Sequence, residues 1–232
     1  AEVTCDKSII DSCEFYGNNE ADNASAGNTV LFNVPLGVFS NNKVHDNVSF
    51  DNAAVCIHGN MTTCVNDIYG NLICNNQAIT TGYCGAAAGG GGMLINAVDF
   101  PASSYTVRDN IFSNNYTGSE TGGGGLYAAF ANFKIFNNDF INNNAVWEGA
   151  ALYIFGMGTT AVIKNNVFFN NTGAWTAQIT NADTVIFDHN WSEHYRYEYV
   201  DTYNVASFTG DTTTEVMGVS PGMAALPAPG VT

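Results

Sequence analysis

The chain has 232 residues and a formal net charge of −15, from 21 acidic and 6 basic side chains. Such an excess of negative charge repels nucleic acids and anionic membrane surfaces, so neither is expected as a partner. No stretch of the sequence is long and apolar enough to predict insertion in a membrane. Asn is abundant, and Val, Ile, Phe and Tyr carry most of the apolar surface, which favours strands over helices.

The first 84 residues contain all the cysteines, which are Cys5, Cys13, Cys56, Cys64, Cys74 and Cys84. An even, clustered set is typical of an oxidising compartment, and the start at Ala1 looks like a mature terminus after removal of a signal peptide. We therefore expect a secreted protein, either extracellular or at the cell surface. Nearest-neighbour pairing predicts the disulfides Cys5–Cys13, Cys56–Cys64 and Cys74–Cys84, one of the fifteen connectivities that six cysteines allow. No Cys-x-x-Cys spacing supports a zinc site instead, and we expect no cofactor.

One phrase, Ile/Val-x-Asx-Asn-x-Phe-x-Asn-Asn, recurs along the chain. Its best copies begin at Val107, Ile135 and Ile163, which are spaced by 28 residues. Weaker copies are predicted to begin at Ile10, Val44, Ile68 and Ile186. Runs of glycine such as 89–92 and 122–125 precede the central copies, and we expect them to allow close packing between repeats.

The repeat predicts stacked strands. Its apolar positions form no clean helical stripe, and Asn pairs and glycine runs oppose helices. Units of this length bury their apolar faces only when they stack on one another. We therefore predict an all-β fold, a single-stranded right-handed parallel β-helix of about seven irregular coils, over residues 1–210, with 1–84 as its disulfide-stapled N-terminal coils.

Parallel stacking places like residues above like, which predicts two columns of side chains. An Asn ladder at the turns would satisfy buried amides repeatedly. Its predicted members are Asn76, Asn115, Asn143 and Asn171. The predicted core stack consists of Phe15, Ile73, Phe112, Phe140, Phe168 and Trp191.

The segments Phe15 to Asn18, Phe112 to Asn115, Phe140 to Asn143 and Phe168 to Asn171 alternate with glycine-rich segments. This pattern resembles the Phe-x-x-Asn and Gly-Gly-Ala-Ile repeats of polymorphic outer-membrane proteins, over about residues 85–175. The resemblance implies a β-helical passenger that serves adhesion and self-association.

Two further features concern the surface. Asn-x-Ser/Thr sequons predict N-glycosylation at Asn23, Asn47, Asn60, Asn115, Asn170 and Asn190. Residues 211–232 are rich in Pro, Gly and Ala, which predicts an extended tail. The apolar tail residues Val216, Met217, Met223 and Leu226 could dock on a neighbouring subunit.

Candidate catalytic residues are few. Asp46, Asp109 and Asp188 are predicted to share one position in the coil. We interpret this position as a ladder position at which Asp alternates with Asn, and not as a catalytic site. The cluster of Asp188, His189, Glu193 and His194 has acid–base or metal-binding potential, but the spacing of its His residues matches no known ligand pattern. We nominate no catalytic or metal-binding residue and do not expect an enzyme.

The sequence therefore favours a structural or adhesive protein that carries covalent glycans and self-associates as a subunit of an extracellular filament or surface layer, built by head-to-tail stacking and tail docking. The alternative is a carbohydrate-active or carbohydrate-binding β-helix, such as a polysaccharide lyase or glycosidase. An ice-binding protein is less favoured, because Thr is dispersed in the sequence.

Overall fold

The computed structural model describes residues 2–4, 7–19, 29–50, 53–58, 63–79, 89–99, 102–118, 122–193 and 200–210. The described residues form strands and no helices. The strands make four sheets in which all pairings are parallel. The prediction of an all-β chain with parallel strands is confirmed. None of the described residues forms a helix long and apolar enough to cross a membrane.

We name the sheets A to D. Sheet A consists of β1 (Glu2–Thr4), β4 (Val30–Asn33), β8 (Val55–His58), β12 (Met93–Asn96), β16 (Leu126–Ala129), β20 (Gly149–Phe155), β23 (Trp175–Thr180) and β26 (Val200–Tyr203). Sheet B consists of β2 (Lys7–Asp11), β5 (Leu36–Ser40), β9 (Val65–Tyr69), β13 (Ser104–Arg108), β17 (Asn132–Phe136), β21 (Thr160–Lys164), β24 (Thr184–Asp188) and β27 (Ser207–Gly210).

The other two sheets have shorter strands. Sheet C consists of β3 (Glu14–Tyr16), β6 (Lys43–His45), β10 (Leu72–Cys74), β14 (Ile111–Ser113), β18 (Asp139–Ile141), β22 (Val167–Phe169) and β25 (Trp191–Ser192). Sheet D consists of β7 (Val48–Ser49), β11 (Gln77–Ala78), β15 (Tyr116–Thr117) and β19 (Asn144–Ala145).

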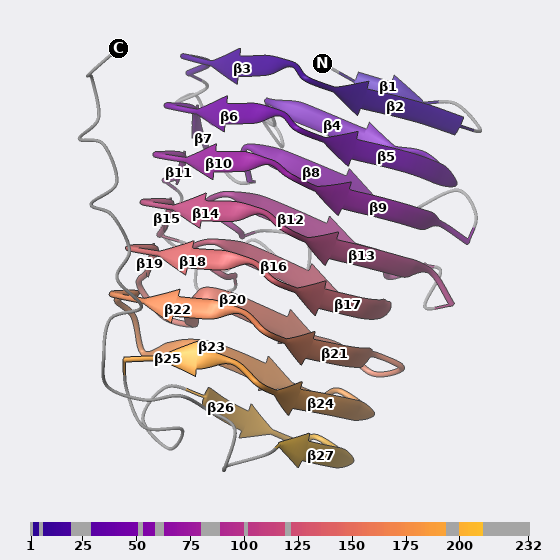
Figure 1. The fold of residues 1–232 in the computed structure, drawn as a ribbon, viewed down its shortest axis with the longest axis vertical. Coiled ribbons are helices and arrows are strands. Elements are labelled where there is room, and N and C mark those ends of the chain that lie inside the picture. The colour runs from indigo at the N-terminus through magenta and orange to yellow at the C-terminus, as the bar shows by residue number, and fades with distance from the viewer. Residues whose placement is uncertain are drawn as a thin grey trace.

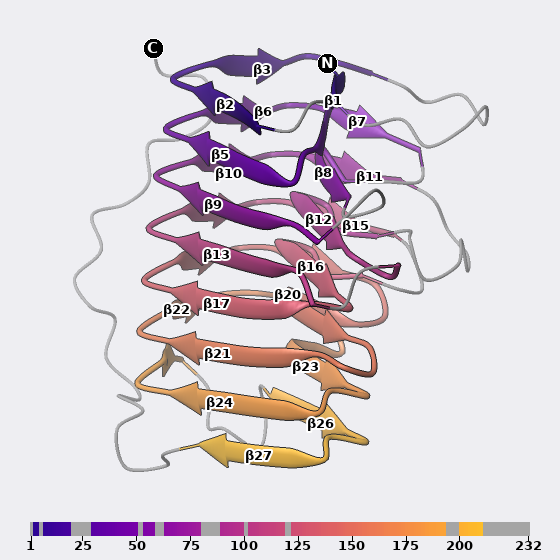
Figure 2. The same ribbon diagram turned by 90° about the vertical axis from the view of Figure 1, so that its right-hand side faces the viewer.

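The central chain visits sheets A, B, C and D in turn and then returns to A beside its previous strand there. We call each circuit a pass, so that β12 to β15 form one pass and β16 to β19 the next. Figures 1 and 2 show the passes stacked one above another along the long axis. Parallel neighbours need a long connection, and here the strands of the other sheets supply it. The arrangement is consistent with a parallel β-helix.

The register of sheet B confirms the predicted 28-residue step. Val107 pairs with Ile135, and Ile135 pairs with Ile163. The weaker copy at Ile68 joins the same column through its pairing with Val107. The copy at Ile10 begins this column.

The predicted copies at Val44 and Ile186 are wrong in register. Val44 lies in sheet C between Phe15 and Ile73, and Ile186 faces outward in β24. The predicted end of the core stack is also wrong, because Trp191 pairs with Val167 rather than with Phe168. Neighbouring passes differ in loop length, and a slip of one residue turns a side chain to the other face of its strand.

The inward side chains of the sheets form one core that runs the length of the stack. In β13, for example, Tyr105 and Val107 are buried and the residues between and beside them are partly exposed. In sheet C, the rings of Phe112, Phe140 and Phe168 stack with centroids 5.0 and 5.2 Å apart. Burying each such ring contributes about 2–3 kcal/mol of hydrophobic stabilisation, so the column is a main source of stability.

Two Asn ladders run along the turns on either side of sheet C. In both, the Nδ2 of each Asn donates to the Oδ1 of its counterpart in the next pass. The first ladder contains the predicted Asn76, Asn115, Asn143 and Asn171 and extends back to Asn47 and Asn18. A second ladder, which the repeat did not predict, consists of Asn42, Asn71, Asn110, Asn138, Asn166 and Asn190.

The ladders explain why Asn occurs in pairs. The residue before each ladder Asn has a positive φ, as in Asn137 (53°) before Asn138 and Asn142 (55°) before Asn143. Asn tolerates this left-handed conformation better than most residues. The first Asn of a pair therefore turns the chain, and the second satisfies buried backbone carbonyls, as when Asn138 Nδ2 donates to Val107 O over 2.9 Å.

The glycine runs allow sheet A to approach its neighbours, as predicted. A Cβ atom on Gly91 would lie 2.4 Å from the backbone oxygen of Tyr116 in sheet D. A Cβ atom on Gly124 would lie 2.3 Å from the backbone oxygen of Ala150 in the next pass. A side chain at either position would collide with backbone that cannot move aside.

The predicted Cys56–Cys64 disulfide is not formed, and both side chains are reduced thiols. Cys64 packs in the main core, whereas Cys56 packs with Leu94 and Tyr127 on the opposite side of sheet A. The two side chains therefore point away from each other, which no disulfide geometry accommodates.

Cys13 and Cys74 also carry free thiols. Their predicted partners, Cys5 and Cys84, lie outside the described residues. The same holds for residues 211–232, so the expected tail with Val216, Met217, Met223 and Leu226 stays a prediction.

Candidate functional site

Half of the predicted glycosylation sites lie inside the ladders. Asn47, Asn115 and Asn190 are each 1% exposed. The Nδ2 of Asn115 donates to Ile73 O over 2.9 Å and to Asn143 Oδ1 over 3.0 Å. A glycan is attached through this nitrogen, so the folded chain leaves no room for one at these positions.

The first ladder also explains how the sequons at Asn47 and Asn115 arise. The second residue after Asn47, Asn76, Asn115 and Asn143 points inward in sheet D, where Ser49, Ala78, Thr117 and Ala145 are all buried. The buried positions hold small side chains, and Ser or Thr at such a position completes the sequon. The motif is here a by-product of packing.

Asn170 is different, because it is exposed on the turn before the ladder residue Asn171. Its Nδ2 donates to Asn142 Oδ1 over 2.7 Å at the surface. A glycan could replace that bond without entering the core. The remaining candidates, Asn23 and Asn60, lie outside the described residues.

The predicted shared column of Asp46, Asp109 and Asp188 is wrong. Asp188 lies within β24 and pairs with Lys164 of β21. Asp109 and Asp46 occupy two different turns, before and after sheet C, each with a positive φ. The three carboxylates therefore face no common cleft, because the assumed register does not hold.

Asp188 and His189 form a local ion-pair cluster. Asp188 Oδ2 lies 3.0 Å from Lys164 Nζ, and Asp188 Oδ1 lies 2.7 Å from His189 Nδ1. The hydrogen bonds from Lys164 and His189 hold the pKa of Asp188 below its ordinary value. Glu193 instead accepts a hydrogen bond from the backbone N–H of Asn170, and His194 lies outside the described residues. No group of three potential metal-ligating side chains occurs in the described part of the chain.

A carboxylate pair that the sequence did not reveal lies beside sheet A. Burial raises the pKa of Glu148, and the charge of Asp201 raises it further. Gln178 bonds to both side chains, with its Nε2 3.3 Å from Asp201 Oδ2. The residues are far apart in sequence, and no motif connects them, so only the pairing of β23 with β26 could bring them together.

The two ends of the stack carry core residues that are incompletely covered. Ile10 and Phe15 in the first pass, and Val200, Val205 and Phe208 in the last, are apolar side chains packed against the core but only partly buried. Their strands β2, β3, β26 and β27 are the outermost in their sheets among the described residues. Unpaired strand edges over an unfinished core are a template for a further strand.

The side chains at the two ends of sheet B are complementary in size. The register places Phe208 in the same inward column as Ser8, and Gly210 in the same column as Ile10. If the last pass of one copy met the first pass of another in this register, each large side chain would face a small one. Such alternation is how packed layers interdigitate.

The ladders give the stack a direction. The backbone N–H and Nδ2 of Asn42 both donate to Asn71 Oδ1, and every later rung repeats this sense. At the start of the first ladder, the N–H and Nδ2 of the exposed Asn18 donate to Asn47 Oδ1, which leaves Asn18 Oδ1 as the acceptor at this end of the stack. The second ladder begins with Cys13, which has only its N–H to donate to Asn42. Continuation by another copy is possible only head to tail.

No family model matches the chain, and searches of the curated proteins and of the solved structures returned no match. The resemblance to polymorphic outer-membrane repeats is thus supported only by the parallel stacking itself.

Proposed function

We propose that this chain is a right-handed, single-stranded parallel β-helix that acts as a secreted structural or adhesive protein and assembles end to end into filaments. Right-handed crossovers are the rule for parallel strands. Sheets A and B each contain eight strands, which supports about eight turns rather than seven. The exposed Asn170 sequon supports glycosylation at a turn, where it leaves both ends unobstructed.

The observation that carries the proposal is the unfinished core at both ends. Phe208 and Ile10 are inward residues of outer strands and are only partly buried, while their counterparts in the middle of the stack are buried completely. A second copy, added head to tail, would bury both side chains and pair both strand edges. Because the contact does not close on itself, it propagates into a fibre.

The test is electron microscopy and sedimentation of the purified chain over a range of concentrations. We expect filaments, or a mass that rises with concentration, and we expect Phe208→Glu to abolish this assembly. Thr209→Glu is the matched control, because it adds the same charge to β27 on the outward side. A strictly monomeric wild type at high concentration, or equal loss of assembly in both variants, would contradict the proposal.

A glycosidase is the second candidate, and Glu148 is the observation that favours it. An acid with a raised pKa beside a second carboxylate is what retaining and inverting glycosidases use. The test is hydrolysis of a panel of neutral and acidic polysaccharides by the wild type and by Glu148→Gln. Hydrolysis lost in the variant would support this candidate, and no hydrolysis by the wild type would reject it.

A further inference from the structure

The outward side of sheet B, which we call the sheet B face, is uncovered by any described residue. Along β9, β13, β17, β21 and β24, residues alternate between buried and at least partly exposed. Sheet A differs, because its outward residues Cys56, Leu94 and Tyr127 are buried. Figure 2 shows the strands of sheet B one above another as one continuous sheet along the long axis of the stack.

Basic side chains gather on this face of a strongly acidic protein. Lys7, Arg108, Lys134 and Lys164 all point outward from sheet B, and Lys43 is the one other basic residue in the described ranges. The face also holds Asp11, Asp67 and Asp188. Asp109, in the turn after β13, lies beside this face, and its Oδ2 is 3.1 Å from the guanidinium of Arg108. The remaining acidic residues whose side chains are described lie elsewhere, at Glu14, Asp46, Asp99, Asp139, Glu148, Asp183, Glu193 and Asp201. The sheet B face therefore carries as many basic as acidic side chains, whereas the rest of the described surface is acidic, so an anionic partner meets the least repulsion on this face.

The centre of the face combines three kinds of contact. Arg108, Lys134 and Lys164 come from three successive strands, and exposed Lys134 forms no ion pair with any described residue. The partly exposed Phe136 lies in the column between Arg108 and Lys164. A row of hydroxyl and amide side chains runs beside them, formed by Ser104, Asn132, Thr160 and Thr184.

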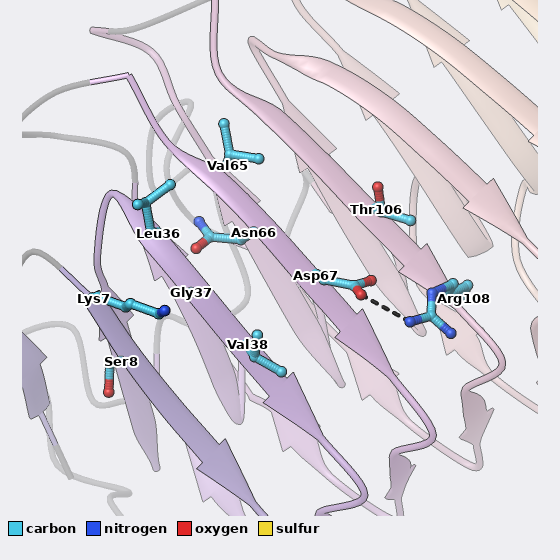
Figure 3. Close-up of a pocket in the computed structure, with 10 residues that line it drawn as sticks. All are labelled: Lys7, Ser8, Leu36, Gly37, Val38, Val65, Asn66, Asp67, Thr106 and Arg108. Carbon is cyan, nitrogen blue, oxygen red and sulfur yellow. Dashed lines mark hydrogen bonds and ion pairs between the residues drawn. The ribbon is translucent and has the colours of Figure 1, made fainter.

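A hollow of about 460 Å³ lies toward the N-terminal end of the same face. Figure 3 shows Lys7 and Arg108 on opposite sides of it, with Arg108 joined to Asp67 over 2.8 Å. Asn66 also lines the hollow, but its side chain points inward, in the column between Gly37 and Tyr105. On the outward side, Asp67 Oδ1 is buried and lacks a hydrogen-bond partner. Buried polar atoms without partners are rare, and a hydroxyl of a ligand in the hollow would supply the missing hydrogen bond.

We infer that the sheet B face binds an acidic polysaccharide, laid across the strands along the long axis of the stack. Arg108, Lys134 and Lys164 bind its carboxylate or sulfate groups, and the hydroxyl and amide row bonds to its hydroxyls. The Phe136 ring packs against the apolar face of a sugar. A nucleic acid fits less well, because it depends on dense phosphate neutralisation, and this chain carries a net charge of −15.

The inference names a ligand for the adhesive role proposed above and rests on that role for its extracellular setting. It does not use the ends of the stack, so it can be tested in the Phe208→Glu variant, which is designed not to assemble. Binding by that variant would stand even if the wild type formed no filament, and filaments without binding would reject this inference alone.

The experiment measures binding of polygalacturonate, dextran sulfate and uncharged dextran of similar length, by titration calorimetry at low and high salt. We expect one or both charged polymers to bind, uncharged dextran not to bind, and affinity to fall with salt. Polygalacturonate binding without dextran sulfate binding identifies a carboxylate ligand, and the reverse identifies a sulfated one. Lys134→Gln should weaken binding about tenfold, because a charge-assisted contact is lost.

Lys43→Gln is the matched control, because it removes the same charge from sheet C and should leave affinity unchanged. Equal weakening in both variants would show a general charge effect and overturn the inference, as would the absence of binding to any charged polymer. If Lys134→Gln instead changes the sedimentation mass while polysaccharide affinity stays the same, the face contacts a second copy, and the inference is also overturned.

Discussion

The side-chain amide of Asn115 donates a hydrogen bond to Asn143 Oδ1, 3.0 Å away, although Asn115 is also the first residue of an Asn-Tyr-Thr sequon. One nitrogen cannot serve both as a buried rung and as the attachment point of a glycan. We therefore expect the folded protein, made in a glycosylating host, to carry no glycan at Asn47, Asn115 or Asn190. Among the described sequons, Asn170 is the one we expect to be modified.

Peptide mass spectrometry of the protein purified from such a host, with and without removal of N-glycans, measures occupancy at each site. Asn170→Gln should remove one glycan without loss of secretion. Full occupancy at Asn115 in soluble, folded protein would contradict the ladder at that position.

The second ladder is expected to stabilise the fold strongly. Asn138→Ala removes the amide that donates to Val107 O and Asn166 Oδ1 and accepts from the N–H of Asn110. It also removes one of the two bonds of Asn110 Nδ2, which keeps its bond to Ile68 O. Each buried group that loses its partner costs about 1–3 kcal/mol, so we expect the free energy of unfolding to fall by about 3 kcal/mol or more. Urea unfolding followed by circular dichroism measures this change.

The neighbouring Asn137→Gly is the control. Asn137 is exposed and has a φ of 53°, a conformation that glycine adopts freely. We expect a change within about 1 kcal/mol. Similar losses in the two variants would mean that the turn, rather than the ladder bond, sets the stability.

The free thiols are expected to react with iodoacetamide in a definite order. Cys13 is exposed and should react first, whereas Cys56 is buried and should not react until the chain unfolds. Burial raises the pKa of Cys74 to about 11, and the nearby charge of Asp46 adds to this. Because the thiolate is the nucleophile, the labelling rate of Cys74 should rise about tenfold with each unit of increasing pH, as long as the pH stays below about 11.

Labelling of the reduced protein at pH 7, 8 and 9, followed by mass spectrometry, gives the three rates. Rapid labelling of Cys56 in the native protein would show that the apolar cluster on the outer side of sheet A is open.

The Lys164–Asp188–His189 cluster makes stability depend on pH. Its hydrogen bonds lower the pKa of Asp188 in the folded state below that of the unfolded chain. The stabilisation is therefore present above the unfolded pKa and is lost as pH falls through the folded pKa. We expect Asp188→Asn to be less stable than the wild type at pH 6 and the difference to disappear by about pH 2.

Urea midpoints at pH 6, 4 and 2 test this, with Asp183→Asn as the control from the turn before the same strand. A difference that stays constant down to pH 2 would show that the carboxylate acts through packing and not through its charge.

The sequence by itself determined the parallel stacking, the 28-residue step of the central passes and the first ladder. These follow from local chemistry, because Asn-Asn pairs set the turns and alternating apolar residues set the strands, and repetition reinforces both. Val107, Ile135 and Ile163 could be aligned from the printed letters alone.

Only the tertiary structure decided the rest. The register of Val44 and Trp191 depends on unequal loops between passes, and one residue of slip exchanges the inner and outer faces. The opposite orientations of Cys56 and Cys64 separate residues that sequence proximity would pair. The gathering of Arg108, Lys134 and Lys164 on one face arises because stacking brings together positions that are 26 to 30 residues apart in the chain.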